Sequence, residues 1–584
     1  MWITTKILWT LYSFFNIWFY IKWRFYNSYD LVDYLIFTLG YLLIFLYSES
    51  FNKLVKNTIA RAAFSIIIIV TYLLAAKYHY RVKTNFDYMI FIENFNELFN
   101  KESADVILST FKAKDIYQAL MAIPLLILAH IKWKIFKIKT ANIKMGLAKL
   151  ITYIILIIIS PFSFGEISYI AKSAYEFHFG GFRKSDNYLV LEKNKNLFKK
   201  VIESKFESSK PNIFLVAMES FNGLYVEKKI NGKFVTPVFN SLINEGLYVE
   251  NFYGNSVQTI KGHYSILCSR IPYIKGKASY KADLSKLDCA PKKLKELGYT
   301  SFYHSSFHNL DFDNTKKFMK GIGFDLLTRS EGSKLTKKQQ VENIWGWGIQ
   351  DNLSYIQYVQ NFKEIEKSKK PVFSMMSTIS HHMKFNKVPN SQKYIFKNKS
   401  GKKEDFINSL HLSDKYLSSF INELKKNNLY QSSIIIITGD HSYPGGEHGL
   451  YDNQVGHYEE FFRTPLLVIW KDKLSAQRLK YKTSSQVDIL PTILDLIGES
   501  GIYNFVGDSI LREENNFAHL VQPYNGQFLS VVKWPYKYVW AKRKNRGFLY
   551  DLMTDPNELS PINNDEIEDK YRKQLDYIYL DNLR

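Results

Sequence analysis

An aspartate and a histidine stand side by side at the end of a short isoleucine run. Residues 434–437 are four consecutive isoleucines, and Gly439, Asp440 and His441 follow closely. β-Branched side chains pack well on a pleated sheet, so the run predicts a strand buried on both faces. Ligands bind at the carboxyl ends of strands in an open α/β sheet, and carboxylate oxygen and imidazole nitrogen both suit zinc or manganese. The pair therefore predicts part of a divalent-cation site, unless Asp440 caps a turn and His441 is a surface residue.

A second carboxylate and a threonine stand in comparable places earlier in the chain. Residues 212–218 are another apolar run, which ends at Glu219. Thr259 is followed by a lysine and a glycine where a loop is expected to enter a helix. A hydroxyl at that junction lies near backbone amides that favour anions. Read from the residues alone, Thr259 is either a helix cap or a nucleophile.

These candidates need an α/β scaffold to bring them together. Strand-like runs alternate with helical patterns, and the strand ends of a parallel sheet meet at one edge. Besides the two runs above, we expect strands at 300–304, 372–378 and 465–470, and a helix over 410–424. The predicted fold class is α/β, with a mixed β-sheet sandwiched by helices.

The first 165 residues are organised differently. They contain five apolar runs of nearly membrane-spanning length, at 5–21, 31–48, 62–76, 116–131 and 147–164. The loop between the last two carries lysines without acidic residues, which predicts a cytoplasmic loop and an extracytoplasmic remainder. We therefore expect a transmembrane domain at 1–165, a connector at 166–210 and a catalytic domain at 211–584. The expected location is a membrane, with everything after residue 165 on its outer face.

Charge and cysteine content agree with this placement. The formal net charge is +22, but the lysines are scattered and no nucleic-acid recognition motif accompanies them, so an anionic membrane surface is the expected partner and nucleic acid is not. The chain has two cysteines, Cys268 and Cys289. In an oxidising compartment they would form one disulfide, and two buried thiols are the alternative.

Six segments follow one another along the chain in a characteristic order: Met218-Glu219-Ser220, Gln258-Thr259-Ile260-Lys261-Gly262, Ser380-His381-His382, Thr438-Gly439-Asp440-His441, Phe462-Arg463-Thr464-Pro465-Leu466 and 549–558. In this order they resemble the lipoteichoic acid synthase and phosphoglycerol transferase family of the alkaline phosphatase and sulfatase superfamily. Five spans followed by an outer hydrolase-like domain is also that family's layout. The resemblance implies the bacterial inner (cytoplasmic) membrane as the location, with the catalytic domain periplasmic or extracellular.

The resemblance implies a metal-dependent transferase. One divalent cation, manganese favoured over zinc or magnesium, would be held by Glu219, Thr259, Asp440 and His441. Thr259 would attack a phospholipid donor, phosphatidylglycerol or phosphatidylethanolamine, to form a phosphoryl-threonine. An extracytoplasmic glycan or glycolipid would then accept the headgroup.

The resemblance also implies residues that contact the substrate. His382 aligns with a histidine that faces the substrate, and its neighbour His381 is a rival for that role. His304 and Lys261 are further substrate-binding candidates, with a packed histidine and a solvated helix lysine as their respective alternatives.

Departures from related patterns bear on the reaction. Residues 259–263 read Thr-Ile-Lys-Gly-His, not the Cys/Ser-x-Pro-x-Arg of sulfatases, which disfavours sulfate ester hydrolysis. A single cysteine pair favours phosphoglycerol transfer over phosphoethanolamine transfer. Ala217 stands where a histidine is expected and Ser442 follows the Asp-His pair, so the headgroup stays open. Phosphoethanolamine transfer and phosphodiester hydrolysis are the alternatives.

Overall fold

The computed structural model divides the chain into two compact units, Met1–Ser185 and Asp186–Arg584. The structure describes 86–95, 165–179 and 196–584 (without 472, 513–515, 525 and 526), together with single residues at 57, 59, 60, 63, 71, 78, 151 and 194. Apart from three of those single positions, the five predicted spans lie outside the described residues. No described helix is both long enough and apolar enough to cross a membrane. In the first unit the structure describes two helices, α4 (Tyr88–Phe95) and α8 (Gly165–Phe179).

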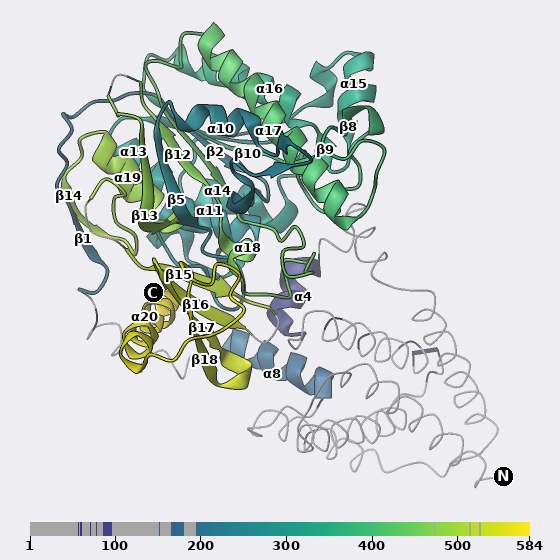
Figure 1. Ribbon diagram of the computed structural model, residues 1–584, viewed down its shortest axis with the longest axis vertical. Coiled ribbons are helices and arrows are strands. Elements are labelled where there is room, and N and C mark those ends of the chain that lie inside the picture. Colours follow the sequence, from purple (N-terminus) through teal and green to yellow (C-terminus); the bar gives the residue numbers. More distant parts are fainter. Residues whose placement is uncertain are drawn as a thin grey trace. The chain divides into compact units, whose positions relative to one another are not determined.

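An eight-stranded sheet forms the centre of the second unit, with the order β13-β5-β12-β11-β2-β10-β6-β7 (Figure 1). Only β12 runs antiparallel to its neighbours, so the sheet is mixed. The strands are β2 (Ile213–Met218), β5 (Leu247–Tyr253), β6 (Thr300–Ser305), β7 (Leu326–Arg329), β10 (Val372–Ser377), β11 (Ile434–Gly439), β12 (Leu466–Ile469) and β13 (Gln477–Ser485).

The five strands expected from the sequence form at the expected places, and all are buried. Alternate side chains of β11 enter opposite hydrophobic clusters: Ile434 and Ile436 face one, and Ile435 and Ile437 face the other. Burying an isoleucine side chain contributes about 1.5–3 kcal/mol relative to exposure, so the run strongly favours a central, two-sided strand. The sequence did not lead us to expect β5, β7 or β13: β5 is interrupted by Glu250 and Asn251, β7 is short, and much of β13 is exposed.

Helices cover both faces of this sheet, which confirms the predicted α/β class. The first cluster packs beneath α11 (Thr259–Cys268), α13 (Ala290–Glu296), α14 (Thr315–Gly321) and α19 (Ile489–Leu496). The second packs beneath α10 (Pro237–Ile243), α16 (Asp351–Glu366) and α17 (Lys402–Lys426). Helix α17 is longer than the predicted 410–424, because its polar ends carry little apolar periodicity.

A smaller antiparallel sheet follows near the carboxyl terminus. It consists of β15 (Ala518–Gln522), β16 (Phe528–Lys533), β17 (Tyr536–Ala541) and β18 (Arg546–Asp551), and α20 (Asp565–Leu583) packs on it. Shorter elements are β1 (Lys199–Ile202) with β14 (Gly501–Asn504), β3 (Lys229–Ile230) with β4 (Lys233–Phe234), β8 (Ile344–Trp345) with β9 (Gly348–Ile349), and helices α12 (Ala278–Lys281), α15 (Lys337–Asn343) and α18 (Glu459–Phe462).

A disulfide bond joins two of the helices on the first face. Cys268 is the last residue of α11, and Cys289 immediately precedes α13. Their sulfur atoms are bonded, and both residues are buried. The bond therefore anchors the end of α11 opposite to the one that carries Thr259.

Candidate active site

The carboxyl ends of β2 and β11 bring two distant carboxylates together. The strands are parallel neighbours, and Gly439 pairs with Met218, so Glu219 and Asp440 leave the sheet at the same level. The backbone N–H of Ser220 donates to Asp440 Oδ1 at 2.8 Å. On the other side of β2, the N–H of Glu219 donates to the Thr378 hydroxyl at 2.8 Å. These two bonds from backbone N–H groups to side-chain oxygens fix both strand ends.

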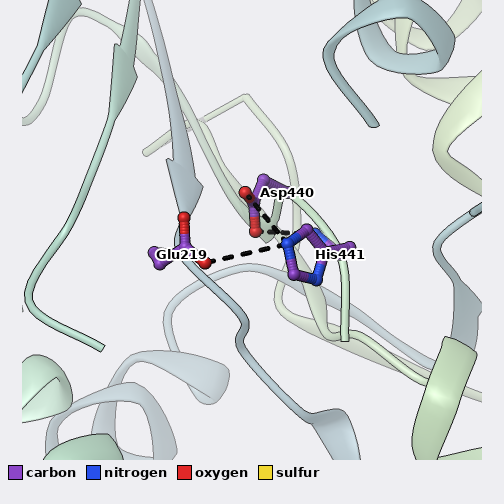
Figure 2. A group of neighbouring side chains, drawn as sticks. All are labelled: Glu219, Asp440 and His441. Carbon is purple, nitrogen blue, oxygen red and sulfur yellow. Dashed lines mark hydrogen bonds and ion pairs between the residues drawn. The ribbon is translucent and has the colours of Figure 1, made fainter. Parts of the chain in front are cut away.

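Three buried side chains converge beyond these strand ends (Figure 2). Glu219, Asp440 and His441 each offer one ligand atom within 4.8 Å of the others. His441 Nε2 lies 3.7 Å from Glu219 Oε1 and 3.7 Å from Asp440 Oδ2. Burial and the neighbouring Asp440 carboxylate raise the pKa of Glu219 well above its usual range. Buried like charges need a counterion.

The free atoms of this group fit a divalent cation. Asp440 Oδ1 accepts the N–H groups of Ser220 and His441, whereas the buried Asp440 Oδ2 has no hydrogen-bond partner. His441 Nδ1 lies 2.8 Å from the carbonyl oxygen of Ser442. Donation to that carbonyl puts the proton on Nδ1 and leaves the Nε2 lone pair directed at the carboxylates. Two carboxylates and a neutral imidazole form a donor set that suits zinc or manganese.

Thr259 is the first residue of α11 and lies beside this group. The preceding Gln258 is in the cap position, so the Thr259 hydroxyl is not used to cap the helix. Thr259 Oγ1 donates to Glu219 Oε2 over a long contact of 3.5 Å. The side chain is half-buried, whereas the three cation-binding candidates are buried. The structure thus brings all four predicted ligands together, with the hydroxyl as the most accessible of them.

Helix α11 is held against the aspartate by a glycine. A Cβ built on Gly262 would overlap the carbonyl oxygen of Asp440. The same carbonyl accepts a hydrogen bond from Gln486 Nε2 at 2.6 Å. Only a residue without a side chain allows this approach of helix and strand end.

The two adjacent histidines differ in their surroundings. His381 is fully buried between the rings of Phe385 and Phe406, and neither ring nitrogen has a hydrogen-bond partner. His382 is partly exposed, and its Nδ1 lies 2.9 Å from the carbonyl oxygen of Met383, which leaves Nε2 available. Burial lowers the pKa of His382 to about 4. Of the two, His382 has the more accessible ring and a ring nitrogen that is free to accept a hydrogen bond.

The other two substrate-binding candidates have protein partners. His304 is buried, with Nδ1 2.8 Å from the Thr328 hydroxyl and Nε2 3.3 Å from the Ser354 hydroxyl. Lys261 is also buried, and its ammonium donates to the carbonyl oxygen of Tyr273 at 2.6 Å. These contacts favour structural roles over direct contact with a ligand.

Sequence reasoning missed several residues that support the site. Ser220 has a positive φ of 55°, and its hydroxyl donates to Glu219 Oε1 at 2.6 Å. Its position next to Glu219 was a usable signal. Thr378 and Gln486 reach the site from other elements, and their sequence context carried no such signal.

The amino-acid sequence is similar to those of known proteins. Residues 211–499 match the family described as Sulfatase, and 446–582 match the N-sulphoglucosamine sulphohydrolase C-terminal family. Lipoteichoic acid synthase 2 of Bacillus subtilis is 27% identical over 379 residues, which cover 62% of this chain and 55% of that protein. Lipoteichoic acid synthase of Staphylococcus aureus is 26% identical over 358 residues, or 57% and 52%. The chain thus spans about half the length of these relatives.

Solved structures share the fold. The lipoteichoic acid synthase LtaP from Listeria monocytogenes has a TM-score of 0.56 and 21% identity, covering 67% of this chain and 98% of that one. An alkaline phosphatase superfamily protein from Vibrio parahaemolyticus has a TM-score of 0.55 and 19% identity, covering 66% and 88%.

Proposed function

We propose that this chain, which matches the Sulfatase family over residues 211–499 and is similar to lipoteichoic acid synthases, is a metal-dependent transferase of phospholipid headgroups. The favoured headgroup is phosphoglycerol, taken from phosphatidylglycerol, and the acceptor is a glycan or glycolipid outside the cell membrane. The observation that carries the proposal is the position of the Thr259 hydroxyl at the start of α11, 3.5 Å from Glu219 and beside the Asp440–His441 pair.

Glu219, Asp440 and His441, together with Thr259, would hold the cation, with manganese favoured. A bound cation lowers the pKa of the threonine hydroxyl and offsets the charge of the phosphodiester. Ser220 holds the Glu219 carboxylate in place through the 2.6 Å bond from its hydroxyl. The amino terminus of α11 directs backbone N–H groups toward an anion at the same point.

The reaction has two steps on Thr259. The hydroxyl oxygen attacks the phosphorus atom, the bond to the diacylglycerol oxygen breaks, and diacylglycerol leaves with a proton. The headgroup phosphate is then bonded to Thr259. An acceptor hydroxyl attacks the same phosphorus, loses its proton and releases the threonine. His382 Nε2, free to accept a hydrogen bond, can orient the attacking hydroxyl.

We also propose a membrane location for this chain. Residues 1–165 would anchor the chain in the bacterial cytoplasmic membrane through five helices, and the catalytic unit would face outward. This arrangement gives the site access to phospholipid donors and is supported by the apolar runs and by the lysine-rich loop before the last of them.

Mass spectrometry of the intact chain tests the nucleophile and the headgroup together. The full-length protein in detergent is mixed with manganese and either phosphatidylglycerol or phosphatidylethanolamine, without acceptor. We expect a glycerophosphoryl adduct on Thr259 with the first lipid; Thr259→Ser should keep an adduct and Thr259→Ala should lose it. An adduct from the second lipid alone would identify a phosphoethanolamine transferase. Diacylglycerol release with free headgroup phosphate, and no acceptor modified when one is supplied, would identify a phosphodiesterase.

A further inference from the structure

A cavity of about 560 Å³ lies on the α17 side of the sheet, away from the cation-binding group. The start of α10, the segment around the 3₁₀ turn Asn390–Gln392 and the middle of α17 enclose it. We call it the α17 pocket. Its lining includes Lys393, Tyr394, Lys397, His411, Lys415 and Tyr416, and no acidic side chain.

The pocket is positively charged. Lys397 and Lys415 are exposed, and within the described part of the chain no carboxylate lies at ion-pair distance from either ammonium. The third lining lysine, Lys393, is paired with Asp405 at 3.5 Å. Outside the lining, the Lys233 ammonium lies 4.0 Å from the centroid of the Tyr394 ring. The acidic neighbour on the same helix, Asp414, accepts the N–H groups of Val238 and Phe239 at 2.8 Å each, so its carboxylate is engaged with α10.

One wall of the pocket is aromatic. The rings of Tyr394 and His411 stack with centroids 5.0 Å apart and planes 13° apart, and Tyr394 remains 48% exposed. His411 Nδ1 lies 3.0 Å from the carbonyl oxygen of Val235. Burial lowers the pKa of His411, and the charges of Lys415 and Lys233 lower it further, so this ring is a neutral, flat surface.

Polar groups lie beside that wall. The Tyr416 hydroxyl donates to Gln392 Oε1 at 2.7 Å, and Ser391 also lines the cavity. Lysines, a stacked aromatic pair and hydroxyl and amide groups together fit a ligand that carries phosphate charges on a hydroxylated carbon chain.

We propose that the α17 pocket binds an anionic polyol segment of the acceptor, either phosphorylated sugar or chained glycerol phosphate. The proposal rests on the transferase function above and names the part of the acceptor that is held outside the reaction centre. Helix α17 connects the pocket with the segment that carries His382: the Ser409 hydroxyl on α17 donates to the carbonyl oxygen of Ser380, two residues before His382, at 3.4 Å. Lys415 lies six residues further along, about 9 Å at the helical rise per residue.

Binding to the full-length protein in detergent tests the pocket without turnover. Isothermal titration with a short glycerol phosphate oligomer, glucose 6-phosphate and inorganic phosphate compares wild type with Lys397→Glu/Lys415→Glu. Removing two charge-assisted contacts should weaken oligomer binding about tenfold or more. The control Lys370→Glu/Lys403→Glu changes the net charge equally at exposed lysines outside the pocket and should bind as wild type does. Thermal unfolding of each variant checks that it is folded.

Comparing the affinities of the three ligands shows which part of the acceptor the pocket binds. Tighter binding of the oligomer assigns the pocket to a growing polymer, and tighter binding of glucose 6-phosphate assigns it to the glycan of a glycolipid. Tyr394→Ala should weaken both organic ligands and leave inorganic phosphate unchanged. Equal oligomer affinity in wild type and in the pocket double variant would overturn the proposal, as would inorganic phosphate binding as tightly as both organic ligands. Because the assay needs no adduct on Thr259, its failure is distinguishable from failure of the transferase proposal.

Discussion

The backbone N–H of Ser220 donates a 2.8 Å hydrogen bond to Asp440 Oδ1 and so ties the ends of β2 and β11 together across the site. This bond and the one from the His441 N–H occupy a single oxygen of the aspartate. The other oxygen has no hydrogen-bond partner and is available to the proposed cation. Because Asp440 Oδ1 holds the fold and Oδ2 is the candidate ligand atom, the effects of a substitution on stability and on cation binding can be measured separately.

Asp440→Asn should remove cation binding without unfolding the chain. An asparagine Oδ1 can still accept both backbone N–H groups, and the loss of one of two neighbouring buried charges relieves Glu219. We expect the variant to be at least as stable as wild type without metal. Manganese at a hundred times its dissociation constant should stabilise wild type by about 2.7 kcal/mol and leave the variant unchanged. Denaturant titration with and without manganese measures both quantities; equal stabilisation of the two proteins would contradict the assignment.

Gly262→Ala should damage both stability and the site. The added methyl group would overlap the Asp440 carbonyl oxygen, so α11 or the end of β11 must move. Overpacking of this kind costs about 1–3 kcal/mol, and Thr259 should move with the helix. Gly332→Ala is the matched control, because a Cβ there meets only an ordinary contact at 3.5 Å. Chemical denaturation and adduct formation are the measurements, and wild-type values of both in the Gly262→Ala variant would refute the close packing.

Trp347→Phe should slow the reaction more than it weakens substrate binding. The Trp347 indole N–H donates to the Met383 carbonyl oxygen at 2.7 Å, the same oxygen that faces His382 Nδ1 at 2.9 Å. Phenylalanine keeps a ring beside His382 but frees that carbonyl to move. The lost hydrogen bond contributes about 1 kcal/mol to holding the His382 ring in place. Losing it corresponds to a several-fold lower kcat with little change in KM. Trp540→Phe, in the smaller sheet, serves as control. A rise in KM alone would argue against a positioning role.

Stability should fall in mild acid, partly because of His304. Burial lowers its pKa to about 3 from an ordinary value of 6.5, so the native protein keeps it neutral. The unfolded chain binds a proton as the pH falls through 6.5 and the native protein does not, so this contribution is complete above pH 6.5 and is lost between pH 6.5 and about 3. At pH 5 the loss is about 2 kcal/mol. His304→Gln should reduce the difference in unfolding free energy between pH 7.5 and pH 5, and the exposed His308→Gln should leave it as in wild type.

Removal of the disulfide should destabilise the chain. Cys268 and Cys289 are 21 residues apart, and closing a loop of this size restricts the unfolded chain by about 3 kcal/mol. Cys268→Ser/Cys289→Ser, or reduction of the wild type, should lower the unfolding free energy by about that amount. Denaturation curves with and without reductant test this, and reductant should leave the double variant unaffected. If the wild-type curves with and without reductant coincide, the disulfide contributes nothing to stability.

The sequence by itself determined the central strands and the candidate carboxylates at their ends. Runs such as 434–437 predicted β11 because four β-branched residues leave no polar face, and a carboxylate directly after each of two such strands indicated their shared edge. Local order also marked Thr259 as the start of a helix. These features depend on neighbouring residues, so they can be read without tertiary structure.

Only the tertiary structure decided which polar side chains reach the site. His304 and Lys261 carry the right chemistry, but the hydroxyls of Thr328 and Ser354 and the carbonyl of Tyr273 bind them from distant segments. The choice between His381 and His382 depended on the aromatic rings that enclose the first and on the carbonyl that orients the second. Strand order was also a tertiary property, because β12 looks like its parallel neighbours in sequence and runs opposite to them. Side-chain partners from distant segments are set by packing, and packing has no local signature in the chain.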